Sequence, residues 1–407
     1  MQKNCYTSLV IGDVGSGKTY IALLSAIGFL FNSINAKATI MAPTEVLAYQ
    51  HYLELIRILE LLEITDITYI YYTSKNILVN NQKQKKFNYQ ELVDKKVIFV
   101  GTHSIINLKE FKIDLVIVDE QHRFGVNQRG SFASNHHFLS FTATPIPRSL
   151  ALSLFSKLNT QFIEKLKSRT EVATELLNID SFFSPAYINY IKDNYTSKQA
   201  KVYIVCPKIE TKEAGEGEDK IYSTIEVFDY LNKYFPNQVM MLTGKDKNKK
   251  DNLLEFKNNF NLKILVATSV IEVGVDISTA RLMIIINAER FGLAALHQLR
   301  GRVGRNDLPD NKCYLCLSKK YMHSTRLRTL VDNYDGFKIA EYDLKNRGSG
   351  DMAGIIQSGF SNEIENLLKS QPDDLEKLQK IVDNLNLGEL PRLQKYLESK
   401  NKEYHGE

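Results

Sequence analysis

Short apolar runs alternate with longer amphipathic stretches along the first 165 residues of the chain. The runs are rich in β-branched residues and have the length of buried strands, whereas the stretches between them have helical length and spacing. Such alternation is typical of a parallel sheet that is covered by helices on both faces. The predicted strands of this first set span residues 7–11, 39–42, 67–72, 97–100, 115–118 and 138–141.

A second alternating set begins after a polar crossing at residues 166–174 and predicts another α/β sheet. Its predicted strands span residues 202–206, 239–242, 263–267, 282–286 and 313–317. Strand patterns end near residue 337, and the later stretch 361–400 is amphipathic and rich in leucine, which predicts a helical tail. The fold class is therefore α/β, with domains expected at 1–165 and 166–335 and a mainly helical element at 336–407.

The composition fits this division but selects no function by itself. A chain of 407 residues with 43% hydrophobic content can bury two ordinary cores. The 52 basic and 47 acidic residues give a net charge of +5, which permits a nucleic-acid partner without requiring one. Four cysteines suit a reducing compartment, and no run reaches the roughly 18 apolar residues that span a bilayer. These features predict a cytoplasmic protein without a membrane partner.

The clearest chemical motif is GDVGSGKT at residues 12–19, between a predicted strand and an apolar helix. Its spacing is that of a Walker A loop, whose glycines let backbone amides and the following helix N-terminus face phosphate. Lys18 is expected to reach the β- and γ-phosphates of ATP, and Thr19 to hold Mg²⁺. The alternative is an accidental glycine-rich turn, since the pattern is expected by chance in on the order of one in a hundred chains of this length. The expected nucleotide-binding residues are Gly12, Gly15, Ser16, Gly17, Lys18 and Thr19.

Two carboxylates, Asp119 and Glu120, follow the apolar run at residues 116–118. At the end of such a strand one carboxylate can hold Mg²⁺, directly or through water, while the next polarises the water that attacks the γ-phosphate. We expect Asp119 to be the Mg²⁺ ligand and Glu120 the catalytic base. A strand that ends in a solvated acidic turn is the alternative, which the phosphate loop upstream makes the weaker reading.

The residues around these carboxylates carry a family resemblance. Residues 119–125, DEQHRFG, and 141–148, FTATPIPR, closely resemble motifs II and III of the RecG family of superfamily 2 DNA helicases, with a DEQH box in motif II. Residues 42–50 and 101–103 resemble motifs Ia and Ib, 266–277 motif V, and 287–305 motif VI. The resemblance implies two RecA-like domains, ATP and Mg²⁺ as cofactors, and helicase or translocase action on branched DNA in recombination and repair.

The resemblance also implies roles for individual residues. Arg302 and Arg305 of motif VI are the expected arginine fingers, since guanidinium groups can neutralise charge that develops on the γ-phosphate. Together with Arg300 they could instead form a basic patch that faces DNA. The remaining implied residues are Gln298 in catalysis, Gly274 and Asp276 at the nucleotide, and His122, Thr142 and Thr144 in coupling between nucleotide and cleft.

DNA contacts are expected where strands end, because a translocating enzyme must hold the backbone without reading sequence. The positions that match the family's DNA contacts are Thr44, Thr102, His103, Thr268 and Ser269. For each of them a capping or turn role is an equal alternative.

Beyond motif VI, residues 339–350 and 357–359 resemble the family's translocation motif, which couples domain closure to movement along duplex DNA. Arg347 and Gln357 are its expected working residues. The alternative is a glycine-rich connector between helices.

The chain departs from the family pattern at its start. Family members carry an N-terminal wedge domain and an adenine-contacting segment, whereas only eleven residues precede Gly12. The expectation is weaker nucleotide affinity and lost junction selectivity unless a separate chain supplies the wedge. A truncated, non-catalytic remnant or one half of a split helicase is one alternative function, and a transcription-repair coupling translocase is another.

Overall fold

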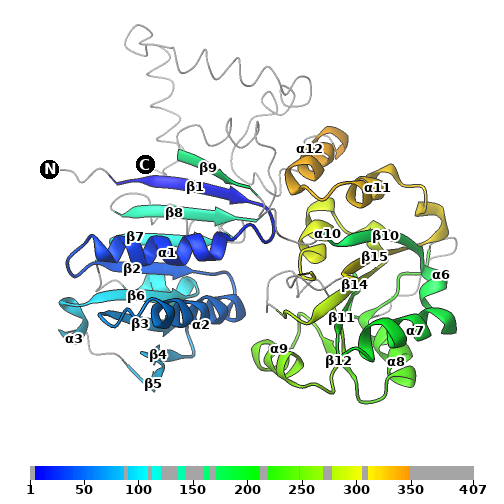
Figure 1. Ribbon diagram of the computed structural model, residues 1–407, viewed down its shortest axis with the longest axis horizontal. Coiled ribbons are helices and arrows are strands. Elements are labelled where there is room, and N and C mark those ends of the chain that lie inside the picture. Colours follow the sequence, from blue (N-terminus) through cyan, green and yellow to red (C-terminus); the bar gives the residue numbers. More distant parts are fainter. Residues whose placement is uncertain are drawn as a thin grey trace, which may run out of the picture.

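The computed structural model describes residues 5–86, 90–108, 112–120, 136–143, 159–164, 171–210, 219–246, 248–268, 277–304 and 310–347. These residues form two α/β lobes that lie side by side (Figure 1). The first lobe contains the elements β1 to β9, and the second lobe contains β10 to α12. Each lobe is built on its own sheet, as the two alternating sets in the sequence predict.

The first lobe has a nine-stranded sheet in the order β5, β4, β3, β6, β2, β7, β8, β1, β9. Neighbouring strands are parallel except where β4 pairs with β3 and β5. Strands β2 and β7 are buried along their whole length, because the sheet is covered on both faces. The strands are β1 (Thr7–Gly12), β2 (Lys37–Met41), β3 (Ile67–Tyr72), β4 (Ile77–Val79), β5 (Gln82–Gln84), β6 (Lys96–Gly101), β7 (Leu115–Asp119), β8 (His137–Thr142) and β9 (Asn159–Ile163).

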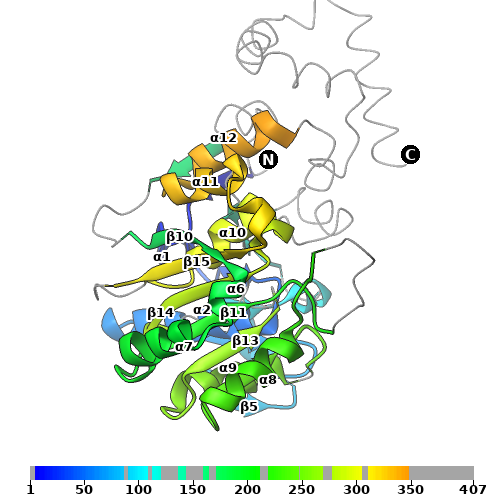
Figure 2. The same ribbon diagram turned by 90° about the vertical axis from the view of Figure 1, so that its right-hand side faces the viewer.

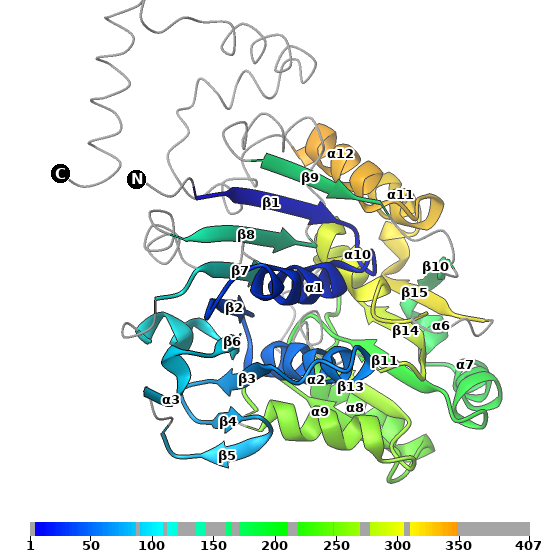
Figure 3. The same cartoon turned by 60° about the vertical axis from the view of Figure 1, so that its left-hand side comes forward.

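Helices α1 (Lys18–Phe31) and α2 (Glu45–Leu61) lie on one face of this sheet (Figure 3). Their apolar sides pack with alternate strand residues such as Ile40 and Ile117. The intervening strand residues, such as Met41 and Val118, face the other side with Leu92 of α3 (Gln90–Val93) and residues of η1 (His103–Asn107). Strand alternation thus divides the core into two layers.

The second lobe has a six-stranded parallel sheet in the order β10, β15, β14, β11, β13, β12. Its strands are β10 (Ala173–Asn178), β11 (Lys201–Val205), β12 (Val239–Leu242), β13 (Ile264–Ala267), β14 (Ala280–Ile286) and β15 (Lys312–Leu317). Helices α6 (Ile179–Phe182), α7 (Pro185–Ile191) and α8 (Thr224–Tyr234), with η3 (Lys192–Thr196), cover one face (Figure 2). Helices α9 (Lys249–Asn258), α10 (Leu293–Arg300), α11 (Thr325–Asp332) and α12 (Gly336–Arg347) cover the other. The short 3₁₀ turns η5 (Ala288–Arg290) and η6 (Lys319–Tyr321) follow β14 and β15.

The predicted α/β class with helix-covered parallel sheets is confirmed, and the central strands lie where the apolar runs predict them. The structure adds β9 and β10 at the sheet edges and the hairpin β4 to β5 within a stretch that is rich in Lys, Asn and Gln. Edge strands carry polar residues on their open side, so periodicity gives little sign of them. The predicted helical tail at 361–400 lies outside the described residues, and so do residues 166–170 of the crossing predicted at 166–174.

No helix in the described part of the chain is both long enough and apolar enough to cross a membrane.

Candidate active site

The phosphate loop begins where β1 ends, and α1 begins at Lys18 directly after it. Gly15 and Gly17 have φ angles of 75° and 86°, a left-handed backbone that favours glycine. A Cβ on Gly12 would lie 2.5 Å from the Oγ of Ser16. The loop therefore requires glycine both for its turn and for its close packing.

The groups of this loop fit a phosphate. Lys18 is buried, and its Nζ donates to the carbonyl oxygens of Gly12 (2.9 Å) and Asp13 (2.7 Å). The buried Oγ of Ser16 has no hydrogen-bond partner among the described residues. Since the N-terminus of α1 also points its free amides at the loop, an anion bound there would satisfy the hydroxyl and attract the lysine.

Asp119 and Glu120 lie at the end of β7, at the same sheet edge as the loop, since β7, β8 and β1 are parallel neighbours. Glu120 has a φ of 54°, which is uncommon for a residue other than glycine and is typical of functional sites. Its carboxylate accepts a long hydrogen bond of 3.5 Å from the amide of Ala143, which follows β8. The first residues of motif II and motif III therefore lie side by side.

The pKa values of the two carboxyl groups are pushed in opposite directions. Burial and the neighbouring charge of Asp119 raise the pKa of Glu120. Burial also acts to raise the pKa of Asp119, but the hydrogen bond from His51 and the charges of His51 and Lys18 hold it below its usual value. Such a division is typical of a site in which one carboxylate stays ionised and the other exchanges a proton.

His51 is a site residue that the sequence analysis missed. Its Nε2 in α2 donates to the Oδ2 of Asp119 at 2.8 Å, and both side chains are buried. A lone histidine within an amphipathic helix gives no sequence sign of such a role. The contact orients the carboxylate and leaves Oδ1 for a ligand.

A magnesium ion needs few protein ligands, because it keeps water and substrate phosphate in its shell. Asp119 ends β7, and Thr19 lies in the first turn of α1, which follows β1 of the same sheet. The described residues contain no cluster of three His, Cys, Asp or Glu side chains. The donor set thus fits Mg²⁺ shared with a nucleotide, rather than a metal held by protein alone.

Motif VI residues approach this site from the second lobe. The charge of Arg302 lowers the pKa values of both Glu120 and Lys18. Gln298 lies on α10 and is buried. The structure thus places Arg302, the expected finger, near the carboxylates of the first lobe.

Arg300 does not belong to a DNA-facing patch, so that alternative is wrong for this residue. Its guanidinium is buried, and Nη1 donates to the carbonyl oxygens of Leu330 (2.6 Å) and Asn333 (2.9 Å). These carbonyls lie at the end of α11, where a helix leaves acceptors unsatisfied. Arg300 therefore joins α10 to α11.

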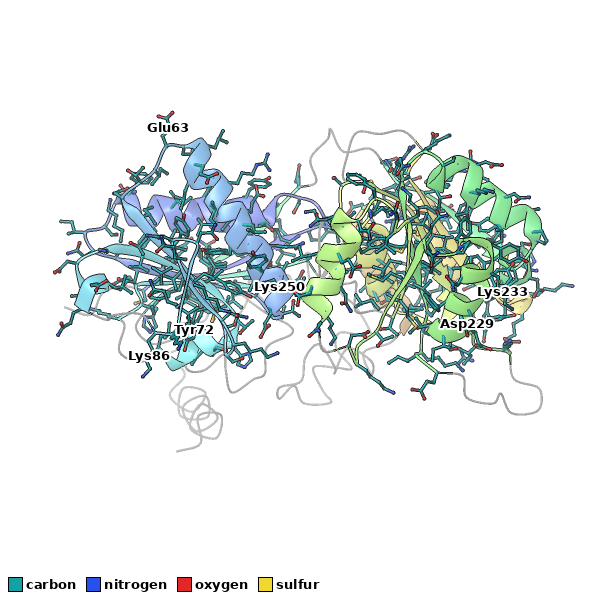
Figure 4. The ribbon with its side chains drawn as sticks, turned by 90° about the horizontal axis from the view of Figure 1, so that it is seen from below. Glu63, Tyr72, Lys86, Asp229, Lys233 and Lys250 are labelled. Atoms are coloured by element: carbon teal, nitrogen blue, oxygen red, sulfur yellow. The ribbon has the colours of Figure 1, made fainter. Side chains whose placement is uncertain are left out.

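Among the described residues, the two lobes meet at the phosphate loop and between α2 and α9. At the phosphate loop, His297 of α10 and the amide of Gly336 in α12 both donate to the carboxylate of Asp13, the latter at 3.0 Å. Below it, the Nζ of Lys250 in α9 lies 3.4 Å from the centre of the Tyr49 ring in α2, and Figure 4 shows Lys250 where these helices meet. Neither Asp13 nor His297 was predicted as a site residue.

The expected DNA contacts that the structure describes follow the carboxyl ends of strands. Thr44 follows β2 and caps α2 by accepting from the amide of Leu47 at 3.3 Å. Thr102 follows β6 and its hydroxyl is 3.2 Å from the Oγ of Ser104, while His103 beside it is exposed. Thr268 follows β13. Capping explains the hydroxyl of Thr44, so its role as a DNA contact remains a prediction.

Of Arg347, the last residue of α12, only the backbone is described. Several other expected residues lie outside the described residues. These are His122, Thr144, Ser269, Gly274, Asp276, Arg305 and Gln357. Thr142 is described: it ends β8, is buried and pairs in register with Ile11 beside the phosphate loop.

Comparison with known protein families supports this arrangement. Residues 2–153 match the DEAD/DEAH box helicase family, and residues 186–307 match the helicase conserved C-terminal domain. The first match contains the phosphate loop and motif II, and the second contains motif VI. The fold and the site therefore define a helicase core of two RecA-like domains.

Within that class the chain is similar to RecG helicases over most of its length. It is 39% identical over 415 residues to the ATP-dependent DNA helicase RecG of Aquifex aeolicus, covering 95% of this chain and 50% of that protein. It is 38% identical to RecG of Synechocystis over 86% of this chain and 42% of that protein. The chain thus spans about half the length of the curated relatives it matches.

Solved structures agree with this relationship. A structure of RecG bound to a three-way DNA junction matches 90% of this chain and 48% of that chain, with a TM-score of 0.65 and 32% identity. Yeast Dbp5 bound to RNA and ADP BeF3 matches 90% of both chains with a TM-score of 0.52, and at 16% identity it supports the fold alone.

Proposed function

We propose that this chain is an ATP-driven DNA motor that hydrolyses ATP with Mg²⁺ between its two lobes and acts as a helicase or translocase on branched DNA. One observation carries the proposal: motif VI of the second lobe meets the phosphate loop of the first, where His297 donates to the carboxylate of Asp13 and the carbonyl of Asp13 accepts from Lys18. A phosphate, a hydrolytic base and a finger require that convergence.

The roles of the residues follow from their chemistry. The loop amides, Ser16 and Lys18 hold the phosphates, and Thr19 and Asp119 hold Mg²⁺. When bound, ATP with Mg²⁺ supplies the phosphoryl group whose transfer to water provides the free energy for movement. Glu120 accepts the proton of the attacking water, for which its raised pKa suits it. Arg302 neutralises the charge that develops in the transition state, together with Arg305.

We propose DNA as the partner because the chain's relative is seen on a three-way DNA junction. Thr44, Thr102, His103, Thr268 and Ser269 would hold the backbone at strand ends. Such work belongs in the cytoplasm, in recombination and repair. The domain division at 1–165, 166–335 and 336–407, with Arg347 and Gln357 in the translocation motif, is part of the same proposal.

The test is ATP hydrolysis by the purified chain, alone and with forked or four-way DNA. We expect DNA-stimulated turnover that Lys18→Ala abolishes, because the loop then loses its cation. Lys233→Ala is the matched control, since Lys233 is exposed on α8 in the second lobe (Figure 4). A folded chain without turnover, or turnover that survives Lys18→Ala, would contradict the proposal.

A further inference from the structure

Asp13, the second residue of the phosphate loop, faces both lobes at once. Its backbone carbonyl accepts from the Nζ of Lys18 at 2.7 Å. Its buried carboxylate accepts from the amide of Val14 (2.6 Å), from the amide of Gly336 (3.0 Å) and from the Nε2 of His297. One residue therefore connects the phosphate-binding lysine with two elements of the second lobe.

The orientation of His297 is fixed by its other ring nitrogen. The Nη2 of Arg300 lies 2.8 Å from Nδ1 of His297. Because a guanidinium group can only donate, Nδ1 accepts and Nε2 carries the proton that is donated to Asp13. The other nitrogen of Arg300 holds the end of α11. A continuous hydrogen-bonded path thus runs from the phosphate loop to α11.

The first turn of α12 is seated on both lobes. Phe337 packs with Leu9 and Ile11 of β1, and its ring centre is 5.9 Å from that of Phe162 in β9. Ile339, one half-turn later, belongs to the core of the second lobe. Motion of one lobe relative to the other must therefore move α12 or break these contacts.

Gly336 leaves no room for a side chain. A Cβ at this position would lie 2.7 Å from both the Oδ1 of Asp13 and the Nε2 of His297. Gly336 is a residue of α12 and not of the phosphate loop. Its replacement therefore perturbs the contact between Asp13 and His297 without removing any group that faces phosphate.

We infer that Asp13 is a positioning residue that transmits the state of Lys18 to α10 and α12. When Lys18 turns from the loop carbonyls to a phosphate, the carbonyl of Asp13 loses a hydrogen bond, and the change reaches His297 and Gly336 through the carboxylate of the same residue. This inference rests on the proposed function, and it specifies how phosphate binding reaches the helix that begins the translocation motif.

The first test is amide hydrogen exchange in the segment 335–343, with and without a non-hydrolysable ATP analogue. We expect the analogue to change exchange in the unmodified chain, and the change to disappear in Asp13→Asn, which removes the charge and an acceptor, and in Gly336→Ala. Gly28→Ala is the matched control, since a Cβ on Gly28 in α1 meets nothing within 4 Å.

The second test separates coupling from nucleotide binding. In Gly336→Ala we expect the loss of stimulation by DNA, about fivefold or more, the range of ordinary allosteric couplings, to exceed any loss of DNA-independent hydrolysis. If the contacts among Asp13, His297 and Gly336 were merely structural, hydrolysis would fall to the same extent with and without DNA. His297→Gln should reproduce the loss.

The outcomes distinguish the two proposals. If the unmodified chain binds the analogue but exchange at 335–343 does not change, or if Gly336→Ala keeps full stimulation, the inference is overturned and the motor remains. If the folded chain neither binds nor hydrolyses ATP, both are overturned.

Discussion

The ammonium group of Lys250 lies 3.4 Å from the centre of the Tyr49 ring, and this cation–π contact joins α9 of the second lobe to α2 of the first. The ring of Tyr71 in β3 flanks the same ammonium at 5.5 Å. Val46, near the start of α2, packs against the core of the second lobe. The lobes therefore hold each other at a second place besides the phosphate loop.

Removing this contact should weaken the association of the lobes. Lys250→Ala is expected to lower the free energy of unfolding by about 1 kcal/mol, the size of a half-buried cation–π pair. Denaturant titration measures the effect, and Lys257→Ala, on the exposed side of the same helix, is the control. Equal stability of both variants would show that the contact contributes nothing.

Replacing Glu120 at the end of β7 should separate ATP binding from ATP hydrolysis. Glu120→Gln keeps the shape of the residue but removes the proton acceptor, so kcat is expected to fall about 100-fold or more while ATP affinity is retained. The rate of phosphate release measures kcat, and binding of a fluorescent ATP analogue measures the affinity. Unchanged turnover would exclude Glu120 as the base.

His51 should matter through Asp119. Losing the hydrogen bond of 2.8 Å frees the carboxylate to rotate, and the apparent Mg²⁺ affinity in the ATP hydrolysis assay is expected to fall about tenfold in His51→Ala. His323→Ala, at an exposed position of the second lobe, should leave the Mg²⁺ dependence as it is. A lower turnover with unchanged Mg²⁺ dependence would contradict the proposed role.

Gly301 is predicted to be essential for lobe contact. A Cβ there would lie 2.3 Å from Cγ1 of Val14 in the phosphate loop, so Gly301→Ala must push the lobes apart. Overpacking of this kind costs about 1–3 kcal/mol, and a tenfold loss of turnover is expected because Arg302 then retreats from Glu120. Adding Val14→Ala removes the clashing methyl and should restore most of the turnover. A double variant as poor as the single one would point to another cause.

Acid should weaken the contacts that the carboxylate of Asp13 makes with the second lobe. Burial acts to raise the pKa of this carboxyl group, but hydrogen bonds from His297, Gly336 and Val14 lower it from 3.8 to about 2. A lowered pKa stabilises the folded state above the unfolded value, so about 2 kcal/mol should be present above pH 4 and be lost as the pH falls toward 2. The stability difference between the unmodified chain and Asp13→Asn, measured by denaturant titration, should therefore shrink across this window. A constant difference would contradict the assignment.

Local patterns in the sequence determined much of this molecule. The spacing of apolar runs predicted the central strands, because a strand buried on both faces must be apolar along its length. The phosphate loop and the pair Asp119 and Glu120 were recognisable because their chemistry depends on neighbours in the chain, such as glycines that turn the loop around Lys18.

Other features depended on residues far apart in the chain, and only the tertiary structure decided them. Edge strands β9 and β10 are polar on their open side, so nothing in their spacing marked them. His51 meets Asp119 across 68 positions, and Asp13 meets Gly336 across 323. Arg300 sits in a motif that suggests a charged surface, yet it is buried on the end of α11. Hydrogen bonds of this kind are set by where whole elements pack, which no local spacing encodes.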